Sequence, residues 1–334
     1  MNPDVWGGTS IVLSGGVLQG IFAVPMKFAR RWNYENIWFV FAFTGLIVFP
    51  WILAWSTIPR LGETYHLAPA GALISAIGFG VCWGIGATLT GLGLNMLGIG
   101  LGFAIILGLS ASMGSLIPFV ILTPERIGTS QGRAYLVGTA VMLAGIAVAA
   151  RAGALRDRGR PERLESEKGT PFLTGLLITI AAGLFSSTLN FSYAFGRPVI
   201  DQALSLGVSQ LWAANAITAL ATTGGFFANL IYCGFLLRRN GTTRRFVLPG
   251  AGINWIYGAT MGAFWLGGQA LYGVGVSRMG DFGTVIGWPL LMGTIILSSN
   301  IAGFLTGEWK QATLPSRLCL FAGMAIALGI LAMK

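Results

Sequence analysis

The sequence predicts an all-α polytopic membrane protein with ten transmembrane helices, arranged as a 5+5 inverted repeat. Three observations lead to this prediction. Apolar runs long enough to cross a bilayer as helices recur along the whole chain. Hydrophobic residues make up 54% of the 334 residues and charged residues only 10%, which leaves too little polar surface for a soluble protein. A stretch in the first half of the chain also resembles a stretch in the second half.

Ten apolar runs are the expected membrane spans, and one long polar segment divides them five and five. That segment, Arg151–Pro171, mixes both signs of charge and is typical of a cytoplasmic linker. We therefore expect a first five-helix repeat over residues 1–152, the linker over 153–170 and a second five-helix repeat over 171–334. The expected spans are 9–26, 36–56, 70–93, 97–122, 134–151, 171–194, 208–236, 248–273, 282–304 and 314–333.

The two similar stretches are Trp83–Gly98, WGIGATLTGLGLNMLG, and Trp265–Gly280, WLGGQALYGVGVSRMG. They lie at the ends of spans three and eight, which are equivalent positions in two halves of five. Because five is odd, a duplicated second half would enter the membrane in the opposite orientation, as in many secondary transporters. Aligned without gaps, the stretches share six identities in sixteen: Trp83/Trp265, Gly86/Gly268, Leu89/Leu271, Gly91/Gly273, Gly93/Gly275 and Gly98/Gly280.

Lysine and arginine are distributed unequally between the two sides of the membrane. The loops after spans one, five, seven and nine hold 15 of these residues, and the opposite side holds 6. Loops rich in lysine and arginine stay in the cytoplasm. Both termini are therefore expected to be periplasmic. The net charge of +10 indicates orientation in a membrane rather than nucleic-acid binding, because its carriers fall between apolar runs.

Patterns typical of enzymes and metal sites are absent from the sequence. The three cysteines lie in apolar runs without paired spacing, and His66 is the only histidine. There is no HExxH motif and no pair of aspartates in mid-span, and one histidine leaves little scope for a catalytic triad. We therefore expect no enzyme activity, no metal and no cofactor.

The polar residues inside the spans are mainly amides and aromatic groups. Such groups are costly in lipid unless they face a cavity or a partner. Amides supply donors and acceptors for sugar hydroxyls, and aromatic rings stack on sugar C–H faces. A cationic ligand would favour a buried carboxylate in the protein, and a phosphorylated ligand would favour a buried lysine or arginine. No charged residue of either kind occurs in mid-span. The candidate substrate-binding residues are Gln19, Trp83, Asn190, Tyr193, Asn254, Tyr257, Gln269 and Trp288.

Several segments resemble the bacterial L-rhamnose–proton symporter family, and the resemblance covers essentially the whole chain. It implies the fold of the drug/metabolite transporter superfamily, with ten helices in two inverted halves. It also implies a multi-pass protein of the bacterial inner membrane that takes up sugar with protons. The segments are Pro25–Trp55, Trp83–Ile105, Gly183–Pro198, Leu206–Val208, Asn254 before Trp265, and Gly307–Lys310.

The proton that this resemblance implies requires a titratable group. The family leads us to expect an acidic residue near Thr284, which is a threonine here. The candidates for proton coupling are therefore the carboxylates at the two ends of span nine, Asp281 and Glu308.

We expect a secondary active transporter that imports a monosaccharide, L-rhamnose or a similar deoxyhexose, with H⁺ by alternating access. Two alternatives stay open. One is a metabolite or drug exporter of the same superfamily, and the other is a non-transporting membrane scaffold. The expected partners are a sugar, the proton and the lipid bilayer.

Overall fold

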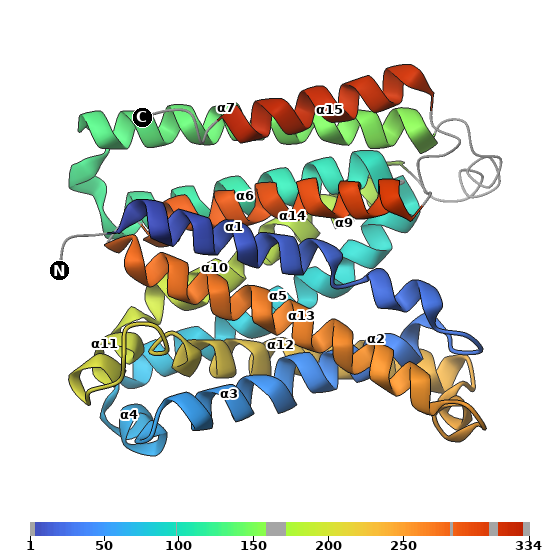
Figure 1. Ribbon diagram of the computed structural model, residues 1–334, viewed down its shortest axis with the longest axis horizontal. Helices are drawn as coiled ribbons and strands as arrows, with labels where there is room; N and C mark the ends of the chain where they lie inside the picture. The colour runs from blue at the N-terminus through green and yellow to red at the C-terminus, as the bar shows by residue number, and fades with distance from the viewer. Residues whose placement is uncertain (1–3, 98, 158–171, 281–282, 307–312, 330–334) are drawn as a thin grey trace.

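The computed structural model describes residues 4–97, 99–157, 172–280, 283–306 and 313–329, and within them the regular elements are helices (Figure 1). In chain order they are α1 (Val5–Ile21), η1 (Val24–Phe28), α2 (Tyr34–Phe43), η2 (Thr44–Val48), α3 (Phe49–Thr57), α4 (Leu61–Leu67), α5 (Ala70–Leu97), α6 (Ile99–Leu122), η3 (Pro124–Arg126), α7 (Ser130–Asp157), α9 (Phe172–Ser186), α10 (Thr188–Phe195), α11 (Arg197–Ser205), α12 (Asn215–Arg239), η4 (Thr243–Val247), α13 (Gly252–Arg278), α14 (Gly283–Leu305) and α15 (Leu314–Gly329).

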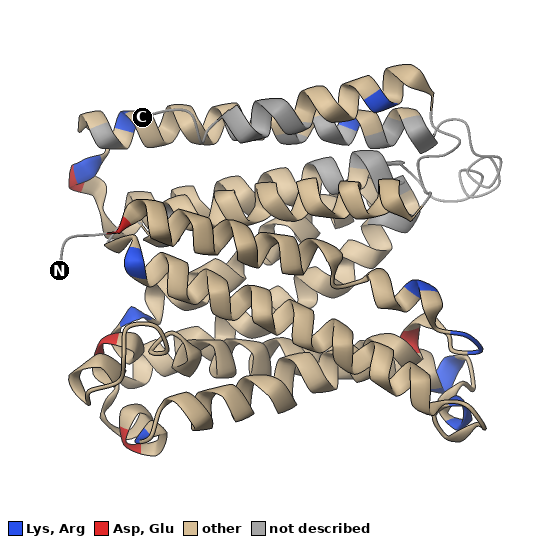
Figure 2. Cartoon of the chain, in the orientation of Figure 1, with Lys and Arg blue, Asp and Glu red and all other residues tan. Residues whose placement is uncertain are grey.

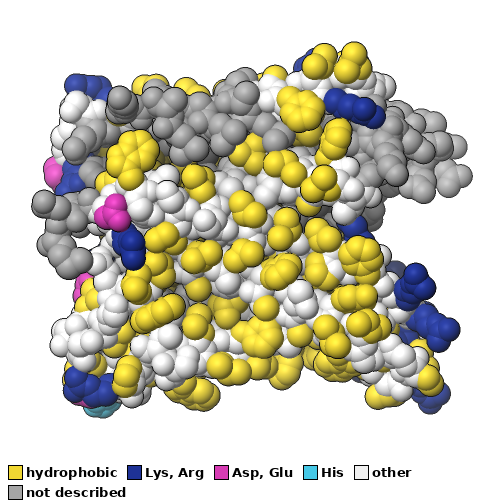
Figure 3. Space-filling view, viewed as in Figure 1, with side chains coloured by type: hydrophobic (Ala, Val, Ile, Leu, Met, Phe, Trp, Pro, Cys, Tyr) yellow, Lys and Arg dark blue, Asp and Glu magenta, His cyan; other side chains and the backbone are white. Residues whose placement is uncertain are grey.

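The protein is a polytopic membrane protein. Seven helical segments of the described residues are long and apolar enough to span a bilayer: Val5–Phe28, Tyr34–Thr57, Ala70–Gly93, Ile105–Leu122, Leu173–Ser205, Asn215–Arg239 and Ile286–Leu305. The other three expected spans coincide with helices α7, α13 and α15. Apolar side chains cover the face of the molecule between its two ends, as a surface in contact with lipid requires (Figure 3).

Several spans depart in detail from the apolar runs. The second span is α2, η2 and α3 in continuous succession, with the π-helical turn η2 between the two α-helices. The sixth expected span is divided at Ser187 into α9 and α10, and α12 begins at Asn215 rather than at residue 208. Helix α7 continues to Asp157, past the expected end of the first repeat. Hydropathy locates apolar residues but does not show where the backbone changes its hydrogen-bonding pattern.

Two groups of contacts organise the centre of the molecule. Helix α1 packs on α13 and α14, and α9 packs on α5 and α6. Helix α5 also packs on α12, and α13 packs on α2. Helices α7 and α15 pack on one another and form the outer layer at the top of Figure 1. Small residues allow the central helices to approach closely. A Cβ atom on Gly15 of α1, for example, would lie 2.7 Å from the carbonyl oxygen of Gly268 in α13.

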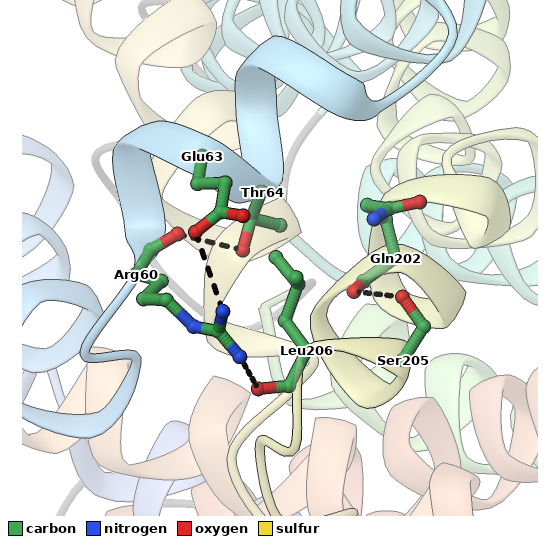
Figure 4. Close-up of polar contacts among 6 residues, drawn as sticks. All are labelled: Arg60, Glu63, Thr64, Gln202, Ser205 and Leu206. Carbon is green, nitrogen blue, oxygen red and sulfur yellow. Dashed lines mark hydrogen bonds and ion pairs between the residues drawn. The ribbon is translucent and has the colours of Figure 1, made fainter.

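Charged residues gather at the two ends of the helices (Figure 2). At one end, arginines pair with nearby carboxylates: Arg60 with Glu63 at 3.6 Å, Arg197 with Asp201 at 2.8 Å and Arg278 with Asp4 at 3.7 Å. Arg60 Nη2 also donates to the carbonyl oxygen of Leu206 at 2.8 Å, which joins the start of α4 to the end of α11 (Figure 4). These exposed pairs contribute little stability individually. The contact of Arg278 with Asp4 and the hydrogen bond of Arg60 to Leu206 join segments from both halves of the chain.

At the other end, the segment after α1 meets the segment before α13. Arg245 Nη1 donates to the Arg31 carbonyl oxygen and to Asn33 Oδ1, both at 2.8 Å. Trp32 Nε1 donates back to the Arg245 carbonyl oxygen at 2.9 Å. This end, referred to below as the basic end, carries the arginines of the loops after α1 and α12.

Candidate functional site

Two glutamines from opposite ends of the sequence meet in the interior. Gln19 of α1 donates through Nε2 to Gln269 Oε1 of α13 at 2.6 Å and to the Trp265 carbonyl oxygen at 3.4 Å. Both side chains are buried, with 5% and 1% of their surfaces exposed. The Nε2 atom of Gln269 is buried without a hydrogen-bond partner among the described residues. A buried donor without a partner costs free energy, so this amide is a candidate group to bond a ligand.

Two tyrosines and an asparagine lie beside the glutamine pair. The Tyr193 hydroxyl of α10 makes a 2.8 Å hydrogen bond with Thr218 Oγ1 of α12 and lies next to Gln269. The Tyr272 hydroxyl of α13 donates to Asn190 Oδ1 of α10, and Asn190 Nδ2 donates to the Gly114 carbonyl oxygen of α6 at 2.7 Å. The rings of Tyr193 and Tyr272 meet edge to face with centroids 5.5 Å apart. Five helices, α1, α6, α10, α12 and α13, therefore contribute hydrogen-bonding groups to this region.

Tryptophans border this network on two sides. Trp83 of α5 and Trp265 of α13 stack with ring centroids 5.2 Å apart and an interplanar angle of 27°. Trp288 of α14 lies against Tyr272 at 5.7 Å, and its Nε1 donates to the Ser110 carbonyl oxygen at 3.0 Å. We call this set the central cluster, and its members are Gln19, Trp83, Asn190, Tyr193, Thr218, Trp265, Gln269, Tyr272 and Trp288.

The chemistry of the central cluster is neutral. Its polar groups are carboxamides, phenols and a threonine hydroxyl, which donate and accept hydrogen bonds without carrying charge. No group of three or more His, Cys, Asp or Glu suited to a metal ion occurs in the part of the chain that the structure describes. Most of the cluster is fully buried, so the structure is closed around it. Such a site suits a neutral molecule that offers hydroxyl groups and an apolar face.

Six of the eight sequence-predicted binding residues fall in the central cluster, and two do not. Asn254 and Tyr257 lie in the first two turns of α13, at the basic end. Asn254 Nδ2 donates to the Arg30 carbonyl oxygen at 2.9 Å, and the Tyr257 ring lies 6.2 Å from the Phe28 ring. With a rise of about 1.5 Å per residue, Asn254 lies roughly 16 Å along α13 from Trp265. The structure therefore does not bring these two residues to the cluster.

Sequence reasoning missed Tyr272, Thr218 and Trp265 as members of the cluster. Tyr272 follows Gln269 by one helical turn, so the same face of α13 carries both. That spacing was a usable signal. No pattern in the sequence pointed to Thr218, because threonines in membrane helices usually bond to the backbone of their own helix. Thr218 also makes such a bond, to the Ala214 carbonyl oxygen at 3.1 Å. The proton-coupling candidates Asp281 and Glu308 lie outside the described residues.

Long apolar helices that enclose a neutral cluster of hydrogen-bonding and aromatic groups define a class of protein, the membrane transporters of small polar molecules. Comparison with known proteins gives the family. The sequence profile of the L-rhamnose-proton symport protein (RhaT) family matches residues 1–333. The chain belongs to that family of sugar–proton symporters and is a transporter rather than an enzyme.

Individual relatives show the same similarity along most of the chain. The L-rhamnose-proton symporter of Cronobacter sakazakii (strain ATCC BAA-894) is 29% identical over 312 residues, which cover 90% of this chain and 88% of the relative. The L-rhamnose-proton symporter of Yersinia pestis (strain Pestoides F) is 26% identical over 308 residues, covering 90% and 89%. At this coverage the similarity extends over both halves of the chain.

Proposed function

We propose that this chain imports a monosaccharide, L-rhamnose or a similar deoxyhexose, together with H⁺ by alternating access. The observation that carries this proposal is the neutral central cluster, in which Gln269 Nε2 is a buried donor without a partner in the described part of the chain. A sugar hydroxyl is the acceptor that this amide lacks. The relatives named as L-rhamnose-proton symporters support the choice of sugar.

Six residues of the cluster contact the sugar in this proposal. Gln19, Gln269, Asn190 and Tyr193 bond the hydroxyl groups of the sugar, exchanging their present mutual hydrogen bonds for bonds to the ligand. Trp83 and Trp288 cover its C–H face and methyl group, because apolar sugar faces pack on aromatic rings. The sugar enters only when helices move apart, since the cluster is buried. The closed state therefore corresponds to an occluded step of the transport cycle.

The 5+5 inverted repeat is part of the proposal, and the packing of equivalent glycines supports it. Gly86 and Gly93 of α5 approach Ser186 and Thr179 of α9. Their counterparts in the second stretch, Gly268 and Gly275 of α13, approach Gly15 and Gly8 of α1. In the register that pairs Gly8 with Thr179 and Gly15 with Ser186, Gln19 is equivalent to Asn190. The two halves then contribute equivalent amides to one site, as alternating access between repeats requires.

A second pair of glycines extends the relationship. Three residues before Trp83 and Trp265 in the alignment lie Gly80 and Gly262. Gly80 of α5 packs on Ala221 of α12, and Gly262 of α13 packs on Gly45 in η2. We propose repeats over residues 1–152 and 171–334, a cytoplasmic linker over 153–170, ten membrane helices in all and periplasmic termini. The cations of the basic end support this orientation.

We further propose that a carboxylate at an end of span nine carries the proton. Asp281 is the preferred residue, because it follows the second copy of the repeated stretch, and Glu308 is the alternative. Protonation from outside and release inside would couple the proton to the sugar, provided that the pKa of the carboxylate differs between the two states.

Reconstituted proteoliposomes test the proposal. Purified protein is screened by thermal unfolding against a panel of hexoses, deoxyhexoses and pentoses, because a ligand that binds only the folded state raises its melting temperature. The stabilising sugar is then offered as a labelled substrate with and without an imposed pH gradient. Uptake that increases when the outside is acidic supports proton symport. Stabilisation by cationic drugs and by no sugar would favour the alternative of a metabolite or drug exporter. Transport only out of vesicles with an acidic interior would favour it as well.

A further inference from the structure

A pocket lies at the basic end of the molecule, away from the central cluster. It has a volume of about 480 Å³ and lies between the segment that follows α1 and the N-terminus of α13. This volume falls within the range of small-ligand pockets. Its charged lining comes from Lys27, Arg30 and Arg31, and Asn254 and Tyr257 line it from α13. The transport cycle proposed above gives this pocket no role.

Two arginines give the pocket its charge. Arg30 and Arg31 lie at its rim, and no carboxylate of the described residues forms an ion pair with either. Their backbone is held in place, because Asn254 Nδ2 donates to the carbonyl oxygen of Arg30 and Arg245 Nη1 to that of Arg31. Arg31 has a φ of 63°, a left-handed conformation that glycine adopts more readily. The backbone conformation alone would favour glycine at position 31. A role of the arginine side chain therefore explains this residue better.

The start of α13 adds partial positive charge. Helix α13 has 27 residues, and its first turn has no side-chain cap. Unpaired N–H groups at such a helix start favour an anion. Asn254 belongs to this first turn and is 4% exposed, and its Oδ1 has no hydrogen-bond partner in the described part of the chain. The pocket thus offers cationic donors together with one buried acceptor.

The rim of the pocket is apolar and faces outward. Ile253 and Phe28 both line the pocket, and 50% and 56% of their surfaces are exposed. Ile256 follows Ile253 on the same face of α13 and is 59% exposed. Cations next to exposed apolar side chains at a helix end are typical of the boundary between hydrocarbon and headgroups. The pocket therefore opens toward the lipid headgroups.

We propose that this pocket binds the headgroup of an anionic phospholipid, phosphatidylglycerol. The phosphate lies between the guanidinium groups of Arg30 and Arg31 and the N-terminus of α13, where charge-assisted hydrogen bonds are available. A glycerol hydroxyl donates to Asn254 Oδ1. An acyl chain follows the exposed stripe of Ile253 and Ile256. The lipid joins the segment that follows α1 to the start of α13, and both helices contribute glutamines to the central cluster.

Native mass spectrometry of the full chain, released from detergent with added lipid, measures this binding directly. The wild type should retain phosphatidylglycerol and not phosphatidylcholine. The double variant R30Q/R31Q should retain it about 30-fold more weakly, since each arginine in contact with the phosphate contributes about a factor of five in affinity. The control R238Q/R239Q removes the same charge from positions at the same end, outside the pocket lining. It should retain the lipid as the wild type does.

Three outcomes separate a bound lipid from a soluble anion and from a general effect of charge. Equal weakening in both double variants would show only general attraction to the basic end and would overturn the proposal. Thermal stabilisation by inorganic phosphate as large as that by phosphatidylglycerol would assign the pocket to a soluble anion instead. Retention of phosphatidylcholine at the same level would also contradict it. The single variants R30Q and R31Q are measured in parallel, so that the result does not depend on the folding of the double variant.

Discussion

Trp83 and Trp265 stack on one another in the interior, with ring centroids 5.2 Å apart and planes inclined by 27°. These are the first residues of the two similar stretches, so two positions that the proposed repeat makes equivalent meet in space. Two equivalent residues touch in this way when they lie close to a pseudo-two-fold axis. A sugar bound beside the pair would contact both halves of the protein, and this is the position that alternating access requires.

The close approaches around this pair predict the effect of adding a methyl group. Gly80→Ala and Gly262→Ala should each destabilise the protein by about 1–3 kcal/mol, because the new Cβ meets backbone atoms of α12 or η2 that have little room to move. Thermal unfolding in detergent measures the loss. Gly78→Ala is the matched control, since a Cβ there meets no atom within 4 Å. It should stabilise α5 by up to about 1 kcal/mol through helix propensity.

The outcome also tests the symmetry of the two halves. If Gly80→Ala and Gly262→Ala impair sugar uptake to a similar degree while Gly78→Ala does not, equivalent contacts matter in both halves. A normal melting temperature for Gly80→Ala would contradict the close packing of α5 on α12.

Gln269 should control the affinity for the sugar. Gln269→Leu removes the donor Nε2 and the acceptor of Gln19, and one lost hydrogen bond to a buried sugar costs about 1–3 kcal/mol, or about 5- to 150-fold in affinity. Titration of the sugar against intrinsic fluorescence measures the dissociation constant. Gln202→Leu in α11 should leave it unchanged. An unaltered dissociation constant in Gln269→Leu would remove this residue from the site.

A comparison of variants at Tyr272 and Tyr65 separates a role in sugar binding from a role in protein stability. Both hydroxyl groups donate inside the protein, Tyr272 to Asn190 Oδ1 and Tyr65 to the Ala216 carbonyl oxygen at 2.9 Å. Burial raises the pKa of Tyr65, so its phenol stays protonated and keeps donating. Replacing either tyrosine by phenylalanine should cost about 0.5–1.5 kcal/mol of stability. Only Tyr272→Phe should also lower the initial rate of sugar uptake, and equal rates in the two variants would argue against the network around Asn190.

The fold was predictable from the sequence because the bilayer imposes simple physical limits. Apolar runs must be helices when they cross lipid, and this placed α5 at residues 70–93 and α12 close to its observed position. The exact breaks were not predictable. The π-helical turn at Thr44–Val48 lies where Gly45 contacts Gly262 of another span, and a contact between distant spans leaves no mark on local hydropathy.

The residues of the candidate site could be predicted in type, but their positions relative to one another only in part. Polar amides in apolar runs identified Gln19, Asn190 and Gln269, because lipid does not tolerate such groups without partners. The same argument selected Asn254, which belongs to the first turn of α13 and bonds to the Arg30 carbonyl oxygen. Hydropathy fixes the depth of a residue only to within a helical turn or two. It also does not show which loop covers the start of a helix.

Proton coupling gives a prediction that depends on Asp281. Asp281→Asn should abolish accumulation of sugar against its gradient while counterflow of labelled sugar persists, because exchange requires no net movement of protons. The matched variant is Asp201→Asn, whose carboxylate pairs with Arg197 on the exposed face of α11. It should accumulate sugar normally. If Asp281→Asn still accumulates sugar and Glu308→Gln does not, the proton-carrying role belongs to Glu308. If the wild type neither acidifies the vesicle interior nor responds to a pH gradient, coupling to protons is wrong.

Single cysteines at the two ends of the helices test the orientation. In a background without Cys82, Cys233 and Cys319, Glu63→Cys lies at the end where arginines pair with carboxylates, and Arg239→Cys lies at the basic end. Arginine-rich loops remain in the cytoplasm because moving their charges across the membrane during insertion is unfavourable. A membrane-impermeant maleimide should therefore label Glu63→Cys in intact cells and Arg239→Cys only after lysis. The reverse pattern would place both termini in the cytoplasm. The lipid pocket would then belong to the outer leaflet, while its pairing of Arg30 and Arg31 with the start of α13 would be unchanged.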